Sequence, residues 1–260
     1  MKSDSLLKLT IVSDVRKNLL YQLIDGPMSL SEIRDHFDVT SANVIPRIKD
    51  LVKMELVMKE GGDYHLTSTG LIIAKKLKMM DRLEEIIEKN GKFLNGHDLI
   101  PLGKLIDDID ELGDFEIISN VMENITATHD QTYNNLSKAK YIVGISPVLT
   151  QSYPETYLAI AQQGIPVSLI VTRNVYKRIE SEYSLFLTSY LGCDNAKMYV
   201  IDDVKFALVV TNDFLSLYLY GKNGTLDIMN CLQSFDESAV NWGTELFQEY
   251  LLRAKEIVRQ

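Results

Sequence analysis

The first half of the chain repeats apolar residues first with the period of an α-helix and then with the period of a β-strand. Three stretches place apolar residues three or four positions apart, which predicts three amphipathic helices. A fourth stretch, residues 55–70, alternates apolar and polar residues on either side of Gly61-Gly62 and predicts a β-hairpin. The predicted helices cover residues 15–24, 29–37 and 41–54.

Local signals set the ends of these helices. Ser29 is followed by Glu32 at the spacing of a capping box. Residues 38–40 form the expected turn, after which Thr40 or Ser41 can cap the third helix. Pro46 removes one backbone hydrogen bond from this helix, so its first turn is expected to be loosened or bent. The apolar stripe continues through the proline, and the segment therefore still predicts a helix.

The third helix has an apolar face and a polar face. We expect Ile45, Ile48, Leu51 and Val52 to point inward, and Asp50 to lie on the outward side. Three helices and a hairpin are the plan of a winged helix-turn-helix domain, whose third helix enters the major groove of DNA. The residues expected to contact DNA are Ser41, Asn43, Pro46, Arg47, Lys49, Lys53 and Lys59.

The chemistry of these side chains decides their expected roles. Asn43 and Arg47 lie four residues apart on one face, and they suit adenine and guanine edges respectively. Lys49, Lys53 and Lys59 are expected to meet phosphates, which position a protein without reading sequence. The alternative is a winged helix that binds protein, although an outward face made of polar residues favours DNA.

A long apolar stripe follows the hairpin. Residues 71–90 carry it along one side of a predicted helix. A helix in this position either pairs two subunits as a homodimer on a two-fold related operator or packs on its own domain. The residues of the stripe are Ile73, Leu77, Met80, Leu83 and Ile87.

The second half of the chain alternates short apolar runs with helical stretches, which predicts an α/β domain with a mixed sheet. A strand, a helix and a second strand over residues 141–171 form a parallel pair. Further predicted elements are a helix over 175–192, strands at 196–201, 205–210 and 215–220, and a helix over 236–259.

Three regions follow from these elements. Residues 1–70 form the winged helix, an α+β domain, and residues 71–135 contain the long helix and short linking helices. Residues 136–260 form the α/β effector domain.

The two halves of the chain also differ in net charge. The net charge is −9, but residues 1–90 hold 14 basic and 14 acidic side chains, so that all the excess negative charge lies further on. Only the first half can approach a polyanion without strong repulsion.

The remaining composition excludes several classes of protein. Hydrophobic residues make up 46% of the chain and charged residues 24%, as in ordinary globular proteins. No apolar run is long enough to cross a bilayer, and the first residues lack the apolar region of a secretory signal, which predicts a cytoplasmic protein. Cys193 and Cys231 are far apart, no Cys-x-x-Cys occurs and the four histidines are scattered, so we expect reduced thiols, no metal site and no cofactor.

Two resemblances extend this interpretation. The order of elements in the second half resembles half of a phospholipase D-like fold, but the chain has no His-x-Lys motif and so lacks the nucleophilic histidine of those phosphodiesterases. The segment from Ser234 to Ala254, with residues 96–118, resembles archaeal regulators that join a winged helix to a filamentation-regulator-type effector domain, among them the methyltransferase-specific regulators of methanogens. The pattern that carries the second resemblance consists of Asp236, Ala239, Trp242, Gly243, Leu246, Phe247 and Tyr250.

That resemblance implies a regulator of transcription whose second domain senses a signal. In an open α/β sheet a ligand site is expected beyond the carboxyl ends of the parallel strands, at Ser146, Arg173 and Asn174. Arg173 suits an anionic small molecule, and Trp242 is a candidate wall of the site. Each has an ordinary alternative: Ser146 as a turn residue, Arg173 as a surface residue and Trp242 as a core residue.

Three functions therefore remain open on sequence grounds. The leading one is a non-enzymatic, homodimeric regulator that binds operator DNA and responds to a small-molecule effector. The second is an enzyme acting on phosphoesters or nucleotides with an appended winged helix, which the absence of Walker, Gly-x-Gly-x-x-Gly and metal-ligand motifs disfavours. The third is a protein-binding winged helix within a larger assembly.

Overall fold

The computed structural model of the chain describes residues 13–37, 41–119 and 135–258, without the side chains of residues 41–43. These residues form two compact units, Met1–Glu85 and Ile86–Gln260, and the boundary between the units falls within one long helix. The division at residues 70 and 135 expected from the sequence stays a prediction.

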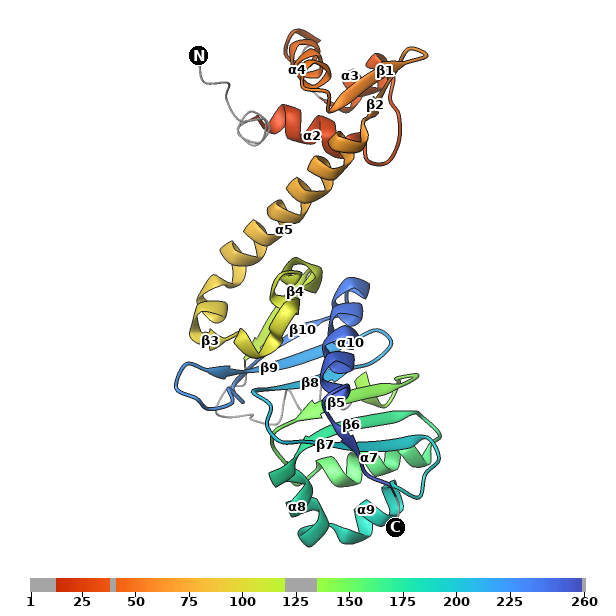
Figure 1. Cartoon of the computed structure of the whole chain (residues 1–260), viewed down its shortest axis with the longest axis vertical. Helices are drawn as coiled ribbons and strands as arrows, with labels where there is room; N and C mark the ends of the chain where they lie inside the picture. Colours follow the sequence, from red (N-terminus) through yellow and green to blue (C-terminus); the bar gives the residue numbers. More distant parts are fainter. Residues whose placement is uncertain (1–12, 38–40, 120–134, 259–260) are drawn as a thin grey trace. The chain divides into compact units, whose positions relative to one another are not determined.

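The amino-terminal unit is a winged helix, as the sequence predicts (Figure 1). Three helices precede a two-stranded antiparallel hairpin, in which Gly61 and Gly62 make the turn with φ angles of 60° and 105°. Met28 forms an antiparallel backbone bridge with Tyr64 on the second strand of the hairpin. The elements are α2 (Asp14–Gln22), α3 (Leu30–His36), α4 (Ser41–Lys53), β1 (Val57–Glu60) and β2 (Asp63–Leu66).

Two local signals in this unit act as the sequence predicts. The hydroxyl of Ser29 accepts a hydrogen bond from the Glu32 amide, and the Glu32 carboxylate accepts one from the Ser29 amide, which completes the capping box. Helix α4 continues through Pro46. The turn expected at residues 38–40 lies outside the described residues.

The long helix α5 (Ser68–Gly96) begins with a threonine cap. The Thr67 hydroxyl donates a 2.7 Å hydrogen bond to the Glu55 carbonyl and accepts one of 3.0 Å from the Gly70 amide. A Cβ atom on Gly70 would lie 1.9 Å from the carbonyl oxygen of Leu56, so only glycine allows the helix to start this close to the preceding turn. The Thr-x-x-Gly sequence after the hairpin is therefore a packing motif.

The carboxy-terminal unit is built on a mixed β-sheet. Its strand order is β11-β7-β6-β5-β8-β9-β10-β4, and β3 pairs with β9 outside this path. Strands β5, β6 and β7 are parallel, and every other pairing is antiparallel. The strands are β3 (His97–Asp98), β4 (Phe115–Ser119), β5 (Ile142–Ser146), β6 (Val167–Thr172), β7 (Ala196–Ile201), β8 (Phe206–Val210), β9 (Leu215–Gly221), β10 (Asn230–Ser234) and β11 (Lys255–Glu256).

Helices cover both faces of this sheet (Figure 1). On one face α10 packs over β5, β8 and β9, and on the other face α7, α8 and α9 pack over β6 and β7. The expected fold classes, a winged helix and an α/β domain with a mixed sheet, are confirmed. The remaining elements are α7 (Tyr153–Gln162), α8 (Arg173–Glu182), α9 (Ser184–Tyr190), α10 (Glu237–Leu251) and the 3-10 helices η1 (Ile100–Ile106) and η2 (Ile109–Leu112).

Helix α10 approaches the sheet closely at Gly243. A Cβ atom there would lie 2.4 Å from the Leu215 Cδ1 atom and 2.8 Å from the Val210 Cγ2 atom. Beside it, the buried Trp242 donates a 3.0 Å hydrogen bond from Nε1 to the Leu105 carbonyl, which satisfies its polar atom inside the core.

The ends of α10 are tied to the segment before β4. The Asp236 carboxylate accepts a 2.6 Å hydrogen bond from the Asp114 amide, and the Tyr250 hydroxyl donates one of 2.6 Å to the Pro101 carbonyl. The remaining residues of the sequence pattern, Ala239, Leu246 and Phe247, are at most 1% exposed. The whole pattern therefore encodes the packing of this helix.

Several predicted elements differ from the structure. The single helix expected over 175–192 is two helices, because Tyr183 has non-helical angles (φ −134°, ψ 40°) that turn α9 back toward α7. The last helix ends at Leu251 rather than at 259, and β11 follows it. Strands β4 and β10 were not predicted, because their pairing joins segments more than a hundred residues apart in the sequence.

Candidate nucleic-acid interface and a cavity in the α/β domain

Helix α4 turns one apolar face into the winged-helix core. Val44, Ile48 and Leu51 are at most 1% exposed and pack with residues of α2, α3 and α5. This differs in part from the expected stripe: Ile45 is only half-buried and Val52 is 38% exposed. The buried residues of α4 start at Val44 and follow at spacings of four and three residues. The buried face is therefore rotated by about one residue relative to the predicted face.

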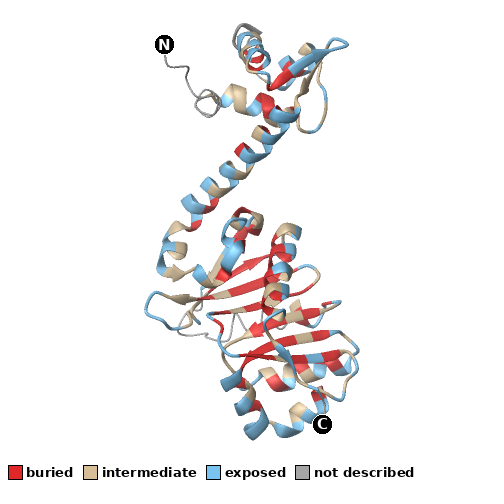
Figure 2. Cartoon of the chain, viewed as in Figure 1, coloured by how far each residue is buried: buried red, intermediate tan, exposed pale blue. Residues whose placement is uncertain are grey.

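The opposite face of α4 is exposed (Figure 2). Three of its side chains are basic. Pro46, Arg47, Lys49 and Lys53 are all exposed. The backbones of Ser41 and Asn43 lie in the first turn of the same helix, while their side chains lie outside the described part of the structure.

Arg47 is held loosely on this face. One of its guanidinium nitrogens lies 3.6 Å from the Asp50 carboxylate, which also accepts a 2.6 Å hydrogen bond from Arg16 on α2. The Arg16 guanidinium holds the pKa of Asp50 below its usual value, with Arg47 as a weaker contributor. Asp50 therefore interacts mainly with Arg16. Arg47 can leave Asp50 and move toward a ligand at little cost, because an exposed ion pair contributes only about 0–1 kcal/mol to stability.

The hairpin adds one expected contact residue. Lys59 on β1 is exposed, and its ammonium group lies 5.3 Å from the centre of the Tyr64 ring. The Tyr64 ring packs against Lys59 from the neighbouring strand, so Lys59 projects from the hairpin and not from α4.

Helix α5 leaves part of its apolar stripe uncovered. Met80 and Ile87 of the predicted stripe are 59% and 53% exposed, and Ile72, which is not part of the stripe, is 62% exposed. Leu77, in contrast, is 3% exposed and belongs to the winged-helix core, so this member of the expected stripe packs on its own domain.

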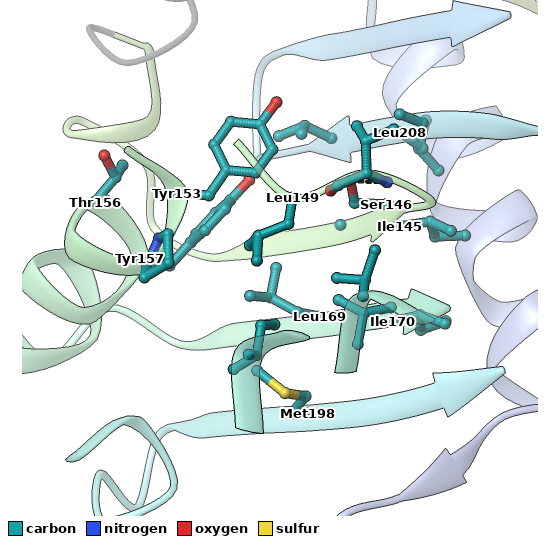
Figure 3. A pocket seen from close by; sticks show the side chains of 18 of the residues that line it. Ile145, Ser146, Leu149, Tyr153, Thr156, Tyr157, Leu169, Ile170, Met198 and Leu208 are labelled. Atoms are coloured by element: carbon teal, nitrogen blue, oxygen red, sulfur yellow. Dashed lines mark hydrogen bonds between the residues drawn. The ribbon is translucent and has the colours of Figure 1, made fainter. Parts of the chain in front are cut away.

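The α/β unit contains an internal cavity of about 180 Å³ between the sheet and helices α7, α8 and α9 (Figure 3). Tyr153 and Tyr157 form one wall, with ring centres 5.9 Å apart in an edge-to-face arrangement. Leu149 and Leu169 contribute an aliphatic wall beside them. Burial raises the pKa of the Tyr157 hydroxyl, so this phenol stays neutral.

The residues predicted to bind a ligand do not come together around this cavity. Ser146 lines it, but its hydroxyl donates a 2.7 Å hydrogen bond to the Val148 carbonyl and is used in a turn. Arg173 and Asn174 lie at the exposed start of α8, where Arg173 donates a 2.9 Å hydrogen bond to Asp202. Trp242 lies in the core that α10 forms with the sheet and does not line the cavity.

Sequence reasoning also missed most of the cavity. Most of its lining comes from the face of the sheet and the facing helices, and a smaller part, including Val148, Leu149 and Ser152, comes from the loop after β5. Tyr153 and Tyr157 sit one turn apart on α7, a pattern that any amphipathic helix can show, so no sequence signal separates a cavity wall from an ordinary core.

Helices of sufficient length and apolar character to cross a membrane are absent from the described chain. No group of three or more potential metal-ligating side chains occurs among residues 13–37, 41–119 and 135–258.

A winged helix, a long following helix and an α/β domain together define a two-domain protein of the winged-helix regulator class. Two domain profiles of one family, described as methanogenesis regulatory protein FilR1, match this chain: the N-terminal domain over residues 4–86 and the middle domain over residues 125–253. The chain belongs to the FilR1 family, which confirms the resemblance to archaeal winged-helix regulators expected from the sequence.

A named relative is the methanogenesis regulatory protein FilR1 of Methanothrix harundinacea (strain 6Ac). It is 24% identical over 259 residues, and the alignment covers 96% of this chain and 58% of the relative. This chain therefore spans little more than half the length of that protein.

Solved structures show weaker likeness. TrmBL2, an archaeal chromatin protein whose structure is described as showing a novel mode of DNA binding, aligns over 97% of both chains with 14% identity and a TM-score of 0.45. NucT from Helicobacter pylori aligns in full with 55% of this chain (12% identity, TM-score 0.45). The phospholipase D family member Nuc from Salmonella typhimurium aligns in full with 56% of it (8% identity, TM-score 0.44). We draw no functional conclusion from alignments at these scores.

Proposed function

We propose that this protein is a DNA-binding regulator of transcription, acting in the cytoplasm without catalytic activity of its own. The observation that carries the proposal is the exposed basic face of α4, on which Arg47 is only loosely paired. Membership of a family named for regulatory proteins supports the same function.

Helix α4 would enter the major groove of the operator. Arg47 would read a base edge together with Asn43, while Lys49 and Lys53 would contact phosphates on either side. Lys59 would contact the backbone from the wing. The acidic α/β domain would stay clear of the duplex, because its excess of carboxylates repels a polyanion.

The protein would bind as a homodimer through α5. Ile73, Met80 and Ile87 are seven residues apart, and Leu83 lies between the last two, which is the spacing of a coiled-coil seam. Met80 and Ile87 are more than half exposed in the single chain, so a second copy of the helix would bury them. A two-fold dimer would place two recognition helices on a palindromic operator.

The α/β domain would act as the sensor. A ligand bound there can change DNA affinity only by the difference between its affinities for the DNA-binding and the non-binding arrangement. Catalysis is not part of the proposal, since the histidine nucleophile of the phospholipase D-like enzymes has no counterpart in a chain that lacks His-x-Lys.

Fluorescence anisotropy with labelled duplex from upstream of the protein's own gene tests this function. We expect saturable binding that weakens steeply between low and physiological salt and that is stronger than binding to a scrambled duplex of the same composition. Equal affinity for both duplexes at every salt concentration would contradict sequence-specific regulation.

A further inference from the structure

The cavity between the sheet and α7–α9 differs from the ligand site expected at the strand ends, because its lining carries no charge. All of the described lining residues are apolar or bear neutral hydroxyl groups, with no Asp, Glu, Lys, Arg or His among them. An ionised ligand would lose its hydration there without gaining an ionic partner, and this loss strongly opposes the binding of a charged molecule. The cavity thus selects against anions, including the carboxylates and phosphates that Arg173 would suit.

The volume of the cavity sets the size of an occupant. At about 180 Å³ it is slightly larger than the engineered apolar cavity of about 150 Å³ that binds benzene. A molecule of about six to ten non-hydrogen atoms fits such a space.

One buried hydroxyl in the lining has no oxygen or nitrogen partner. It belongs to Ser216 on β9, which is 1% exposed. The Ser216 hydroxyl contacts the Cys231 thiol, which is a weak hydrogen-bond donor and acceptor. A buried hydroxyl with so weak a partner is poorly satisfied, so a ligand that forms a full hydrogen bond with Ser216 would bind more tightly than one without a polar group.

A second unpaired atom lies next to Ser216. Gln233 on β10 is the direct cross-strand partner of Ser216, is 3% exposed, and has a carbonyl oxygen without a partner. Directly opposite residues of an antiparallel pair project from the same face of the sheet. Gln233 does not line the cavity itself, but it lies behind Ser216 and leaves the surroundings of that hydroxyl polar and uncharged.

The cavity has an opening through which a ligand can enter. Ser152 is exposed and Leu149 and Thr156 are partly exposed, and all three line the cavity around the start of α7. Figure 3 labels Leu149, Tyr153 and Thr156 among the lining residues.

We propose that this cavity binds a neutral, largely apolar small molecule with a single uncharged hydrogen-bonding group, which pairs with the Ser216 hydroxyl. The inference rests on the proposed function, since it assigns the sensing role of the α/β domain to this cavity. It replaces an anionic effector at Arg173 by an uncharged effector between the sheet and α7.

Two probe molecules of nearly equal size test the ligand class, because the proposal expects one of them to bind and the other not to bind. Benzyl alcohol is neutral and benzoate is anionic, and each is titrated into the full-length chain labelled at isoleucine methyl groups for NMR. We expect benzyl alcohol to shift the methyl resonances of Ile145, Ile170 and Ile179, which line the cavity, in a saturable way. The resonances of Ile33 and Ile48 in the winged helix serve as an internal control. Saturable shifts of the same size with benzoate, or none with benzyl alcohol, would overturn the proposal.

Variants locate the bound probe. Ser216→Ala should weaken benzyl alcohol binding about twofold to tenfold, the range of one hydrogen bond, while Ser168→Ala on β6, outside the lining, should leave it unchanged. Ala207→Leu adds side-chain volume to the lining and should abolish binding. Thermal unfolding followed by circular dichroism shows whether each variant folds. If Ala207→Leu does not fold, the titrations of the wild-type protein with benzyl alcohol and benzoate still decide the proposal.

The anisotropy assay on the same samples separates this inference from the proposed function. A chain that binds operator DNA but neither probe would refute the cavity proposal alone. A chain that binds benzyl alcohol in the cavity but shows no preference for operator DNA would refute the regulator and leave the cavity assignment standing.

Discussion

The guanidinium group of Arg47 lies 3.6 Å from the carboxylate of Asp50, one turn further along α4. Asp50 makes its shorter contact, of 2.6 Å, with Arg16. Helix α4 is thus fastened to α2 through Arg16 and Asp50, while Arg47 is exposed on the outer face of α4. The difference of 1 Å between the two contacts decides which arginine has a structural role and which one we expect to bind DNA.

Removing the Arg47 side chain should affect DNA recognition and leave folding unchanged. We expect Arg47→Ala to weaken operator binding by about 1–3 kcal/mol and to relax the preference at one base pair, because a bidentate contact to guanine is lost. Competition with operator variants in the anisotropy assay measures both effects. Arg178→Ala, which breaks an exposed ion pair with Glu182 on α8, is the control and should not alter binding. Unchanged affinity and base preference in Arg47→Ala would exclude this face of α4 from the groove.

Lysines on α4 should contribute through phosphates. Replacing Lys49 or Lys53 by alanine should lower the slope of log K against log salt concentration by about 1 for each, and it should weaken operator and scrambled duplex equally. Lys177→Ala on α8 provides a charge-matched control. A loss confined to the operator would show that the lysine reads bases instead.

The exposed stripe on α5 should hold the dimer together. We expect the double variant Met80→Glu/Ile87→Glu to sediment at half the mass of the wild-type protein, because two charged side chains would face each other across the seam. Ile100→Glu changes another exposed apolar residue, 81% exposed, and should leave the mass unchanged. Leu77 is unsuitable for this test, since it belongs to the winged-helix core and a charge there would unfold that unit.

Close approach of α10 to the sheet should make Gly243 intolerant of a side chain. Gly243→Ala places a methyl group 2.4 Å from Leu215 and should lower the free energy of unfolding by about 1–3 kcal/mol, which urea denaturation measures. Gly91→Ala on α5 is the matched control: its nearest neighbour would be 3.7 Å away, and the helix should gain up to about 1 kcal/mol. Equal effects of both substitutions would contradict the packing described for α10.

Stability of the winged helix should fall at high pH through Tyr21 and Lys17. Both side chains bond to Asp81, at 2.8 Å and 2.9 Å respectively. Burial and the bond to Asp81 raise the pKa of Tyr21 above its ordinary value of 10.0, and the bond to Asp81 raises the pKa of Lys17 above 10.5. The folded state then holds protons that the unfolded state releases, so this stabilisation is complete below pH 10 and is lost as the pH rises above it.

The Tyr21→Phe variant isolates one of these groups. It should be less stable than the wild-type protein at neutral pH by about 0.5–1.5 kcal/mol, the contribution of one hydrogen bond, and the difference should shrink above pH 10. Urea denaturation at several pH values measures it. A difference that stays constant across the alkaline range would exclude the Tyr21 hydroxyl as the titrating group.

Much of the winged helix could be predicted from the sequence because its signals are local. The Ser29–Glu32 capping box, the glycine turn and the apolar stripes each depend on residues a few positions apart. The orientation of α4 was less accurate, with Val44 missed and Val52 placed inside, because a stripe of neighbouring apolar residues fits two rotations that differ by one position.

In the α/β domain the sequence determined the alternation of strands and helices, the absence of a His-x-Lys nucleophile and the family pattern around Trp242. Only the tertiary structure decided that this pattern packs α10, that β4 and β10 pair, and that an uncharged cavity lies beneath α7. The physical reason is sequence separation: Trp242 and Leu105 are 137 residues apart, and Ser216 and Tyr157 meet only when the sheet and its helices assemble. A periodic pattern specifies which face of an element is apolar, but the partner of that face, and the space left between them, arise from contacts that no local pattern contains.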